Sequence, residues 1–290
     1  LVDAVWGKAR PVPPDGPVVA HPLKYAGRAA DDKIAAVQKT LKDAGQDAVV
    51  LTSPDSVCWL LNIRGQDVAH NPVALAFAIV PASGKPELFL TAGRLTKEAQ
   101  SELNGVVKVS PPAGLKARVQ ALRKAGKRVR LDSDRAAWWF ARALGKSAVR
   151  GSDPCVAMKA IKTATEIKGS RIAHVRDGAA VVRFLAWLDG ALAAGDAIDE
   201  IGAVQALEGF RAGSQALREI SFDTISGSGA NGAIVHYRVT EASNRRLRAG
   251  ELFLVDSGAQ YLEGTTDITR TVAVGAPSDE ARTRYTLVLK

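Results

Sequence analysis

Two aspartates, Asp256 and Asp267, are the residues of this sequence whose type and spacing suggest chemistry. Residues 251–255 form an apolar, β-rich run that ends at Asp256, and Asp267 lies in a second β-rich run over residues 265–274. A carboxylate at the end of a buried strand needs a cation, hydrogen-bond donors or a proton. If a hairpin brings both carboxylates together, they repel each other unless positive charge lies between them. A pair of divalent metal ions meets that requirement.

The spacing of the two runs leaves the role of the aspartates open. A turn near residue 263 places Asp256 opposite about residue 270, so the carboxylates are offset diagonally, and a bulge directly after Asp256 would align them. The alternative is structural. In it, Asp256 starts an Asp-Ser-Gly turn and Asp267 pairs with Arg270. Spacing alone does not decide between a metal site and this pairing.

Four stretches of the chain resemble one family, the pita-bread (creatinase-fold) metallopeptidases, and within it the long, three-domain aminopeptidase P group, the Xaa-Pro aminopeptidases. The stretch around the aspartates, LVDSGAQYLEGTTDITRTV, is similar to the signature of that family. Because the similarity is spread over most of the chain, it is far more specific than any single motif. The other three stretches are Trp59-Leu-Leu-Asn-Ile-Arg-Gly65, Ala173-His-Val-Arg-Asp-Gly178 and Gly232-Ala-Ile-Val-His-Tyr237.

The resemblance implies a metal-dependent aminopeptidase that releases the N-terminal residue from peptides with proline in second position. It implies that Asp256 and Asp267 hold two divalent ions, which acidify a bridging water to a hydroxide that attacks the carbonyl before proline. Manganese is the expected metal, with zinc or cobalt as alternatives. His236 matches a catalytic and substrate-binding histidine that hydrogen-bonds the substrate or the tetrahedral intermediate. Thr269 and Arg270 are candidates to orient or neutralise the carboxylates, although Arg270 could equally be an ordinary salt-bridge partner.

The glycines before His236 fit the pattern G-x-G-x-x-G over residues 227–232. A dinucleotide-binding fingerprint must open a helix whose amide groups meet the pyrophosphate. The following residues, 233–240, are β-branched and aromatic and predict a strand. The sequence therefore argues against nucleotide binding, and the glycines are expected to bring His236 to the edge of a cleft.

Two helices are predicted before this region. Thr163 and Glu166 form a capping box that opens a long helix to about Ala194, with Gly195 as its end, and a second helix follows near 199–210. His174 shares a stripe of the long helix with apolar residues, which predicts a hydrogen-bonded core histidine. The apolar residues of that stripe are Ile167, Val181, Phe184, Leu185 and Leu188.

Residues 31–150 alternate between helical and strand patterns, which predicts an α/β domain with a mixed sheet. Helices are expected near residues 31–44 and 93–102, within the basic run 116–130 before residue 128, and near 134–144; strands are expected at 48–52, 57–63, 74–80, 87–90 and 128–131. The resemblance implies that this domain is ribonuclease-H-like, of the creatinase N-terminal type. We expect a connector from a missing preceding domain at residues 1–24, the α/β domain at 25–152, and the N-terminal half of a pita-bread domain at 153–290.

The charge and amino-acid composition limit which partners the protein can bind and in which cellular compartment it is expected. The net charge of +9 suggests nucleic acid as a partner. However, the basic residues of 116–130 alternate with apolar residues at helical spacing, and no aromatic residues that could stack on bases lie among them. We expect neither nucleic-acid binding nor, without a long apolar run, a membrane span. The opening residues lack the pattern of a secretory signal, and the two cysteines are expected to be buried free thiols. These features predict a cytoplasmic protein, and the resemblance implies a homodimer that acts on peptides.

The sequence departs from the family at its C-terminal end. The family completes its metal site with a histidine and two glutamates in later motifs, and the chain ends at Lys290 before any of them. We therefore expect an internal portion of a longer protein, inactive by itself because two carboxylates bind divalent ions weakly. The alternatives are a non-catalytic peptide- or protein-binding module on a pita-bread scaffold and, within the same fold, an Xaa-Pro dipeptidase.

Overall fold

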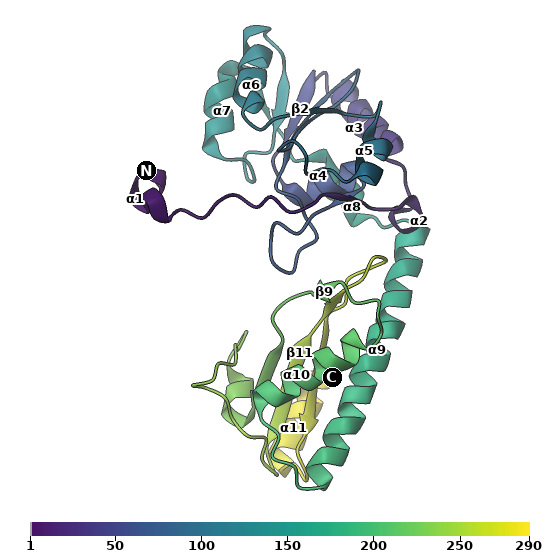
Figure 1. Ribbon diagram of the computed structural model, residues 1–290, viewed down its shortest axis with the longest axis vertical. Helices are drawn as coiled ribbons and strands as arrows, with labels where there is room; N and C mark the ends of the chain where they lie inside the picture. Colours follow the sequence, from purple (N-terminus) through teal and green to yellow (C-terminus); the bar gives the residue numbers. More distant parts are fainter. Residues whose placement is uncertain (1) are drawn as a thin grey trace. The chain divides into compact units, whose positions relative to one another are not determined.

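The computed structural model describes residues 2–290, which form two compact units that divide after residue 165. Each unit has its own sheet and its own hydrophobic core (Figure 1). None of the helices within residues 2–290 combines the length and apolar character that a membrane-spanning segment requires. The predicted domain boundary near residue 152 stays a prediction.

The first unit is built on a six-stranded mixed sheet in the order β6-β5-β4-β2-β7-β8. Strand β4 pairs antiparallel with β2 and β5, whereas the other three pairings are parallel. The mixed sheet predicted from the sequence is therefore confirmed. The strands are β2 (Ala48–Leu51), β4 (Phe77–Pro81), β5 (Glu87–Phe89), β6 (Lys108–Ser110), β7 (Val129–Leu131) and β8 (Ala148–Arg150).

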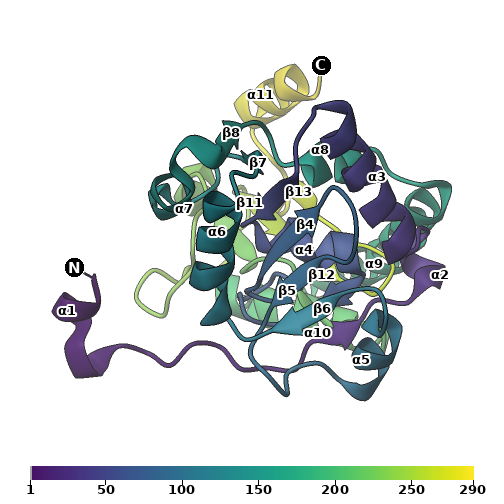
Figure 2. The same cartoon turned by 90° about the horizontal axis from the view of Figure 1, so that it is seen from above.

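Helices cover both faces of this sheet, which is why β2 is buried at every residue. One face packs against α3 (Ala30–Asp43), α4 (Pro54–Leu61), α5 (Lys97–Leu103) and α8 (Pro154–Ala160). The other face packs against α6 (Gly114–Lys124) and α7 (Trp138–Leu144), which lie side by side in both views (Figures 1 and 2). The basic residues of α6 thus lie on a helix whose apolar side, Leu115, Val119 and Leu122, is buried, as expected.

Shorter elements complete the first unit. Strand β1 (Val19–Ala20) pairs with β3 (Ile63–Arg64) in a separate two-stranded sheet. Cys58 and Cys155 are free and buried, which confirms the predicted thiols. The remaining elements are α1 (Val2–Trp6), η1 (Gly7–Ala9), α2 (Leu23–Ala26) and η2 (Gly145–Ser147).

The predicted strand over residues 57–63 is wrong, because this segment is largely helix α4. The helix begins with Pro54 at its first turn and ends at Asn62, whose backbone is left-handed with φ of 52°. Six of its eight residues are buried, so its apolar run lacks the polar face that marks a helix in a sequence. A short, continuously apolar run does not distinguish a buried strand from a buried helix.

The second unit consists of a three-stranded antiparallel sheet, β10-β11-β13, with helices packed on it. The long helix α9 (Ala164–Ala193) runs beside this sheet together with α10 (Glu200–Ala212), as Figure 1 shows, and both helices confirm the sequence prediction. Their apolar residues, among them Phe184 and Leu207, meet Phe253 and Val255 of the sheet in one core. The other elements are β9 (Glu219–Ile220), β10 (Ile225–Ser228), η3 (Gly229–Ala233), β11 (Leu252–Ser257), β12 (Ala259–Gln260), β13 (Ile268–Ala273) and α11 (Asp279–Leu289).

Two further predictions in this unit are wrong. His174 is exposed instead of lying in the core, although its Nδ1 lies 2.8 Å from the Ser170 carbonyl oxygen. The face of α9 that is buried at this level carries the small or polar residues Gly169, Ala173 and Asp177, which an apolar stripe does not reveal. Residues 233–240 contain no strand: η3 is followed by a turn that contains His236.

Candidate metal site

The predicted hairpin brings the two aspartates to one side of the sheet. Strands β11 and β13 pair with Asp256 opposite Thr269 and Ser257 opposite Ile268. The same register continues beyond the strands, because the Thr266 amide donates to the Ala259 carbonyl oxygen at 2.9 Å. Side chains alternate between the two faces of a sheet, and diagonal neighbours share a face. Asp267, two residues before Thr269, is therefore the diagonal neighbour of Asp256.

The diagonal offset of the two carboxylates is as predicted, although Asp256 lies opposite Thr269 and not about residue 270, and the bulge considered at 257–258 is not present. The turn closes with a hydrogen bond from the Tyr261 amide to the Gly264 carbonyl oxygen at 2.9 Å. Gln260 is bridged to Thr265, in the same register as the pairing of Asp256 with Thr269, so no residue is inserted between them. A slip of one residue moves side chains to the opposite face. The observed register thus places both carboxylates together without a bulge.

Gly258, which follows the Asp256–Ser257 pair, is required by close backbone packing. A Cβ atom at this position would lie 2.1 Å from both the Ser221 hydroxyl oxygen and the Thr266 carbonyl oxygen. Ser221 also donates a hydrogen bond to that carbonyl at 2.9 Å. The absence of a side chain lets the strand that carries Asp256 approach the segment that leads into Asp267.

The hairpin tip lies directly on helix α9. A Cβ atom at Gly169 would lie 2.5 Å from the Glu263 carbonyl oxygen, so the turn touches the helix backbone. Arg176, two turns further along the helix, forms an ion pair with the Glu263 side chain, and its guanidinium lies over the Tyr261 ring. These contacts fix the tip of the hairpin relative to α9.

The electrostatics of the two aspartates favour a bound cation. The Oδ1 atom of Asp256 is buried and has no hydrogen-bond partner among the described residues. Burial, the negative charge of Asp256 and a hydrogen bond between the two side chains raise the pKa of Asp267. In the metal-free molecule the pair therefore holds a proton more readily than a single aspartate. A divalent ion can replace that proton and use the unpartnered oxygen.

The aspartate pair supplies only part of a coordination shell. Within residues 2–290, no group of three or more histidine, cysteine, aspartate or glutamate side chains is arranged to hold a metal ion. Arg270 donates from Nη1 to the Thr269 carbonyl oxygen at 2.7 Å, and strand alternation places its side chain on the face opposite Asp256. No salt bridge of the described residues joins it to Asp267. The roles predicted for Thr269 and Arg270 stay predictions.

His236 lies in the turn after η3, exposed and with a left-handed backbone at φ of 52°. No hydrogen bond or ion pair among the described side chains connects it to Asp256 or Asp267. Its neighbour Tyr237 is buried and bonds to the buried carboxylate of Glu200. The strand predicted here on side-chain propensity is overridden by these tertiary contacts, a recurrent outcome for β-branched segments.

The sequence did not predict a buried hydrogen-bond network that contacts residues adjacent to the two aspartates. Asp177 and Arg211 are both completely buried and form two hydrogen bonds, at 2.7 and 2.9 Å. Asp177 also accepts hydrogen bonds from the hydroxyls of Tyr261 and Thr266, each at 2.9 Å, and Arg211 donates to Ser257 at 3.1 Å. The network thus touches the hairpin next to both aspartates. Asp177 lies within the Ala173–Gly178 stretch that carried the resemblance, but its partners are too far away in the sequence to be inferred.

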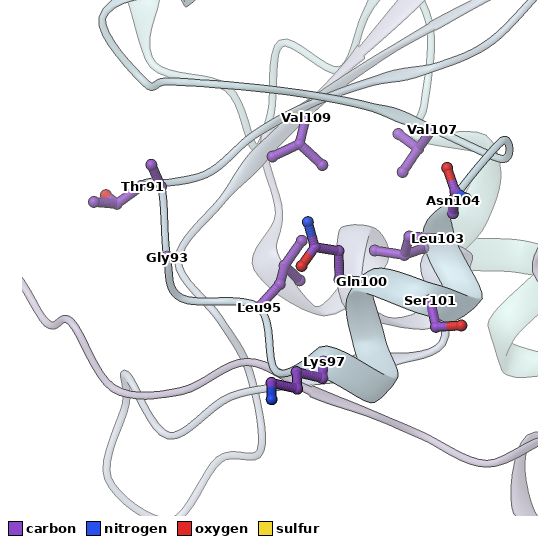
Figure 3. Close-up of a pocket in the computed structure, with 11 residues that line it drawn as sticks. Thr91, Gly93, Leu95, Lys97, Gln100, Ser101, Leu103, Asn104, Val107 and Val109 are labelled. Carbon is purple, nitrogen blue, oxygen red and sulfur yellow. The ribbon is translucent and has the colours of Figure 1, made fainter.

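A cavity of about 690 Å³ lies in the first unit, and none of the residues that line it is a predicted site residue. Figure 3 shows Gln100 and Leu103 of α5 facing the same space as Leu95, Val107 and Val109. None of the residues that line it is a histidine, a cysteine or an acid. It offers no chemistry that matches the aspartate pair.

Comparisons with known proteins place the chain in a family. Residues 9–166 match the Creatinase/Prolidase N-terminal domain, and residues 168–290 match Metallopeptidase family M24. The chain therefore belongs to the creatinase/prolidase family, with an N-terminal domain of that type and an incomplete pita-bread domain. Both the family and the fold class predicted from the sequence are confirmed.

Among curated relatives, the chain is similar to proteins named probable Xaa-Pro aminopeptidase P. The sequence identity is 38% to the one from Neosartorya fischeri and 39% to the one from Laccaria bicolor, over 300 residues in each case. Both alignments include 100% of this chain and 46% of the relative. The chain thus spans about half the length of the curated relatives it matches.

Among solved structures, the chain is similar to the X-prolyl aminopeptidase of Caenorhabditis elegans, described as a cytosolic enzyme with a di-nuclear active site. The TM-score is 0.90 at 31% identity, covering 96% of this chain and 46% of that one. The Xaa-Pro dipeptidase of Bacillus anthracis shares the fold, with a TM-score of 0.70 at 24% identity, over 90% of this chain and 69% of that one.

Proposed function

We propose that the protein to which this chain belongs is a metal-dependent aminopeptidase that removes the N-terminal residue from peptides with proline in second position. The observation that carries the proposal is the register of β11 and β13, which places Asp256 and Asp267 as diagonal neighbours on one face of the sheet, in a fold shared with X-prolyl aminopeptidases. The relatives at 30% identity or more are named as peptidases, which favours an enzyme over the non-catalytic binding module. A carboxylate pair also has no evident use in a module that only binds peptides.

Asp256 and Asp267 would hold two divalent ions, manganese first, with zinc or cobalt as alternatives. When bound, such ions polarise a carbonyl group and lower the pKa of a water molecule. The buried, unpartnered Oδ1 of Asp256 and the raised pKa of Asp267 both suit this exchange of a proton for a cation. Further ligands would have to join the pair, because few oxygen ligands bind divalent ions weakly.

Two other side chains would support the reaction. The exposed imidazole of His236 can donate a hydrogen bond to the oxyanion that develops on the substrate carbonyl, or carry a proton to the leaving amine. Thr269 lies directly opposite Asp256 in the hairpin, where its hydroxyl can orient that carboxylate. Arg270 would act on the sheet's other face, through charge and not through direct contact.

The same proposal includes partners and location. Peptide substrates with proline in second position follow from the names of the relatives. A cytoplasmic location is supported by the description of the Caenorhabditis elegans enzyme as cytosolic. We further propose a homodimer that binds neither nucleic acid nor membrane.

Hydrolysis of the tripeptide Arg-Pro-Pro tests the function. The intact protein, including whatever chain adjoins this sequence, is assayed with manganese and then with a chelator. We expect release of arginine only with metal, and its loss in Asp267→Ala. The matched control is Asp196→Ala, which removes an exposed acid of the same unit and should leave the rate unchanged. Cleavage that persists in the chelator would contradict the proposal.

A further inference from the structure

The loop that carries His236 is held in a conformation that its own residues do not favour. A left-handed backbone is unfavourable for a residue other than glycine, and it persists only where the surroundings determine it. The two residues before His236 give no anchor, because Ile234 and Val235 are 53% and 82% exposed. Tyr237, at 6% exposure, is the buried residue beside the histidine. What holds Tyr237 therefore holds the turn.

Tyr237 and Asn231 flank His236 and converge on one carboxylate. The Tyr237 hydroxyl lies 3.1 Å from Oε2 of Glu200, and it accepts a hydrogen bond from Nδ2 of Asn231 at 2.8 Å. The same Asn231 nitrogen lies 3.0 and 3.1 Å from the two carboxylate oxygens of Glu200. One residue before the histidine and one after it are thus joined to the same group.

Glu200 also holds the two ends of the loop. Its Oε1 accepts a hydrogen bond from the Ser228 amide at 2.7 Å, where β10 ends, and its Oε2 accepts one from the Arg245 amide at 3.1 Å. All four donor residues therefore lie within 228–245, two on each side of His236. Glu251 is also bonded to the two ends of the loop, through Ser228 Oγ at 3.3 Å and Arg245 Nη2 at 2.8 Å, but among the described carboxylates only Glu200 bonds to Asn231 and Tyr237 as well.

The Glu200 carboxylate is held in place by its position at the start of a helix and by its burial. The residue is 0% exposed and lies in the first turn of α10, whose N-cap is Asp199. The N-terminal end of a helix stabilises negative charge, so the carboxylate is tolerated there without a cation. No salt bridge among the described residues includes Glu200, and the guanidinium of Arg245 pairs instead with Glu251 at 2.8 Å.

We propose that Glu200 is a positioning residue: through Asn231 and Tyr237 it holds the turn in which His236 presents its imidazole to the substrate. The inference rests on the proposed function, which assigns that imidazole its role. Glu200 itself touches neither the substrate nor the aspartate pair. Its loss leaves the hairpin of Asp256 and Asp267 in place and lets the turn relax.

The test compares Glu200→Gln, His236→Ala and the double variant in the intact protein with manganese and Arg-Pro-Pro. A catalytic group displaced by about 1 Å loses on the order of 100-fold in rate, so we expect kcat to fall about 10- to 100-fold in Glu200→Gln. The affinity for manganese, measured by titration calorimetry, should stay within about twofold, because the aspartates are unchanged. The double variant should be no slower than His236→Ala, since the two residues act as a unit.

Amide hydrogen exchange on the metal-free protein gives a readout that does not depend on activity. Glu200→Gln should accelerate exchange in residues 228–245 and leave the hairpin, 252–273, unchanged. Glu208→Gln is the matched control, because Glu208 is also on α10 and accepts a hydrogen bond from Thr224 at 3.2 Å, outside the loop. It should change neither exchange in the loop nor kcat. If Glu200→Gln does not fold, Tyr237→Phe gives the same comparison with a smaller loss.

The outcomes separate this inference from the proposed function. Normal activity in His236→Ala would overturn the role assigned to the histidine. Impaired His236→Ala together with normal Glu200→Gln would overturn the positioning inference alone. The positioning inference would also be overturned if the two substitutions lowered kcat by independent factors, because Glu200 would then act by another route.

Discussion

The second unit contains two completely buried carboxylates, and they are satisfied in opposite ways. Asp177 is paired with an equally buried cation, Arg211, through two hydrogen bonds. Glu200 has no cation partner among the described residues and is surrounded by amide and hydroxyl donors. Asp177 bonds to the hairpin of the two aspartates, whereas Glu200 bonds to the loop of His236. Each network therefore supports a different part of the candidate site.

This difference shows how one unit can give two parts of a site different stabilities against local opening. Removing one partner of a buried ion pair strongly destabilises the fold, because the charge of the other partner stays buried without compensation. Hydrogen bonds from neutral donors are worth less each, and the donors can turn to water when the loop opens. We infer that the hairpin is held permanently and that the histidine loop can open locally. Four measurements test this contrast, from the largest expected effect to the smallest.

Asp177→Asn should cause the greatest loss of stability. The substitution keeps the shape of the side chain but leaves the Arg211 charge buried and unpaired, which costs about 3–5 kcal/mol. Urea denaturation measures the free energy of unfolding. The matched control is Asp43→Asn, which breaks the exposed pair with Lys39 and should change stability by about 0.5 kcal/mol or less. If Asp177→Asn lowers the free energy of unfolding by less than about 1 kcal/mol, the hairpin is not held more firmly than the histidine loop.

Glu200→Gln should destabilise less, by about 1–3 kcal/mol, because it leaves neutral donors without an acceptor and exposes no unpaired charge. The same denaturation experiment compares it directly with Asp177→Asn. The contrast fails if Glu200→Gln costs as much as Asp177→Asn or more.

The response to acid should distinguish the two networks. Burial by itself would raise the pKa of Asp177, but hydrogen bonds and charge from Arg211, with the hydroxyls of Thr266 and Tyr261, outweigh it and lower the pKa. A lowered pKa in the folded state gives stability that is present above the ordinary value of 3.8 and is lost as the pH falls through the folded pKa. One such group contributes a slope of at most about 1.4 kcal/mol per pH unit. Denaturation below pH 3.8 should show a shallower slope for Asp177→Asn; an unchanged slope would contradict this account.

Tyr237→Phe should have the smallest effect. It removes one hydroxyl from the Glu200 network and leaves Asn231 and both backbone donors in place, so we expect a loss of about 0.5–1.5 kcal/mol. Thermal melting measures the change, with Tyr285→Phe on the exposed side of α11 as a control without effect. A loss above that of Glu200→Gln would show that the hydroxyl acts mainly elsewhere, through Ser243.

The sequence predicted the hairpin, because an apolar run ending in a carboxylate is visible to simple pattern analysis. Spacing left open whether its two aspartates form a metal site, and the family resemblance favoured that site. The sequence placed Asp256 opposite about residue 270 instead of Thr269, since Gly264 marks a turn without showing which two residues form it. Helix α4 escaped detection because six of its residues are buried and the polar face is missing. Neither the Asp177 nor the Glu200 network was predictable, since each joins residues from segments far apart along the chain. The family resemblance supplied the role of His236, which spacing alone could not.

Gly169 limits which residues the sequence can carry at this position, for a reason unrelated to catalysis. Because the Glu263 carbonyl oxygen occupies the space where a Cβ atom would be, helix and hairpin meet here through main-chain atoms. A backbone carbonyl cannot adopt another rotamer, as a side chain could, to make room for a larger residue. Position 169 is thus closed to every residue larger than glycine unless the whole tip of the hairpin lifts away from the helix.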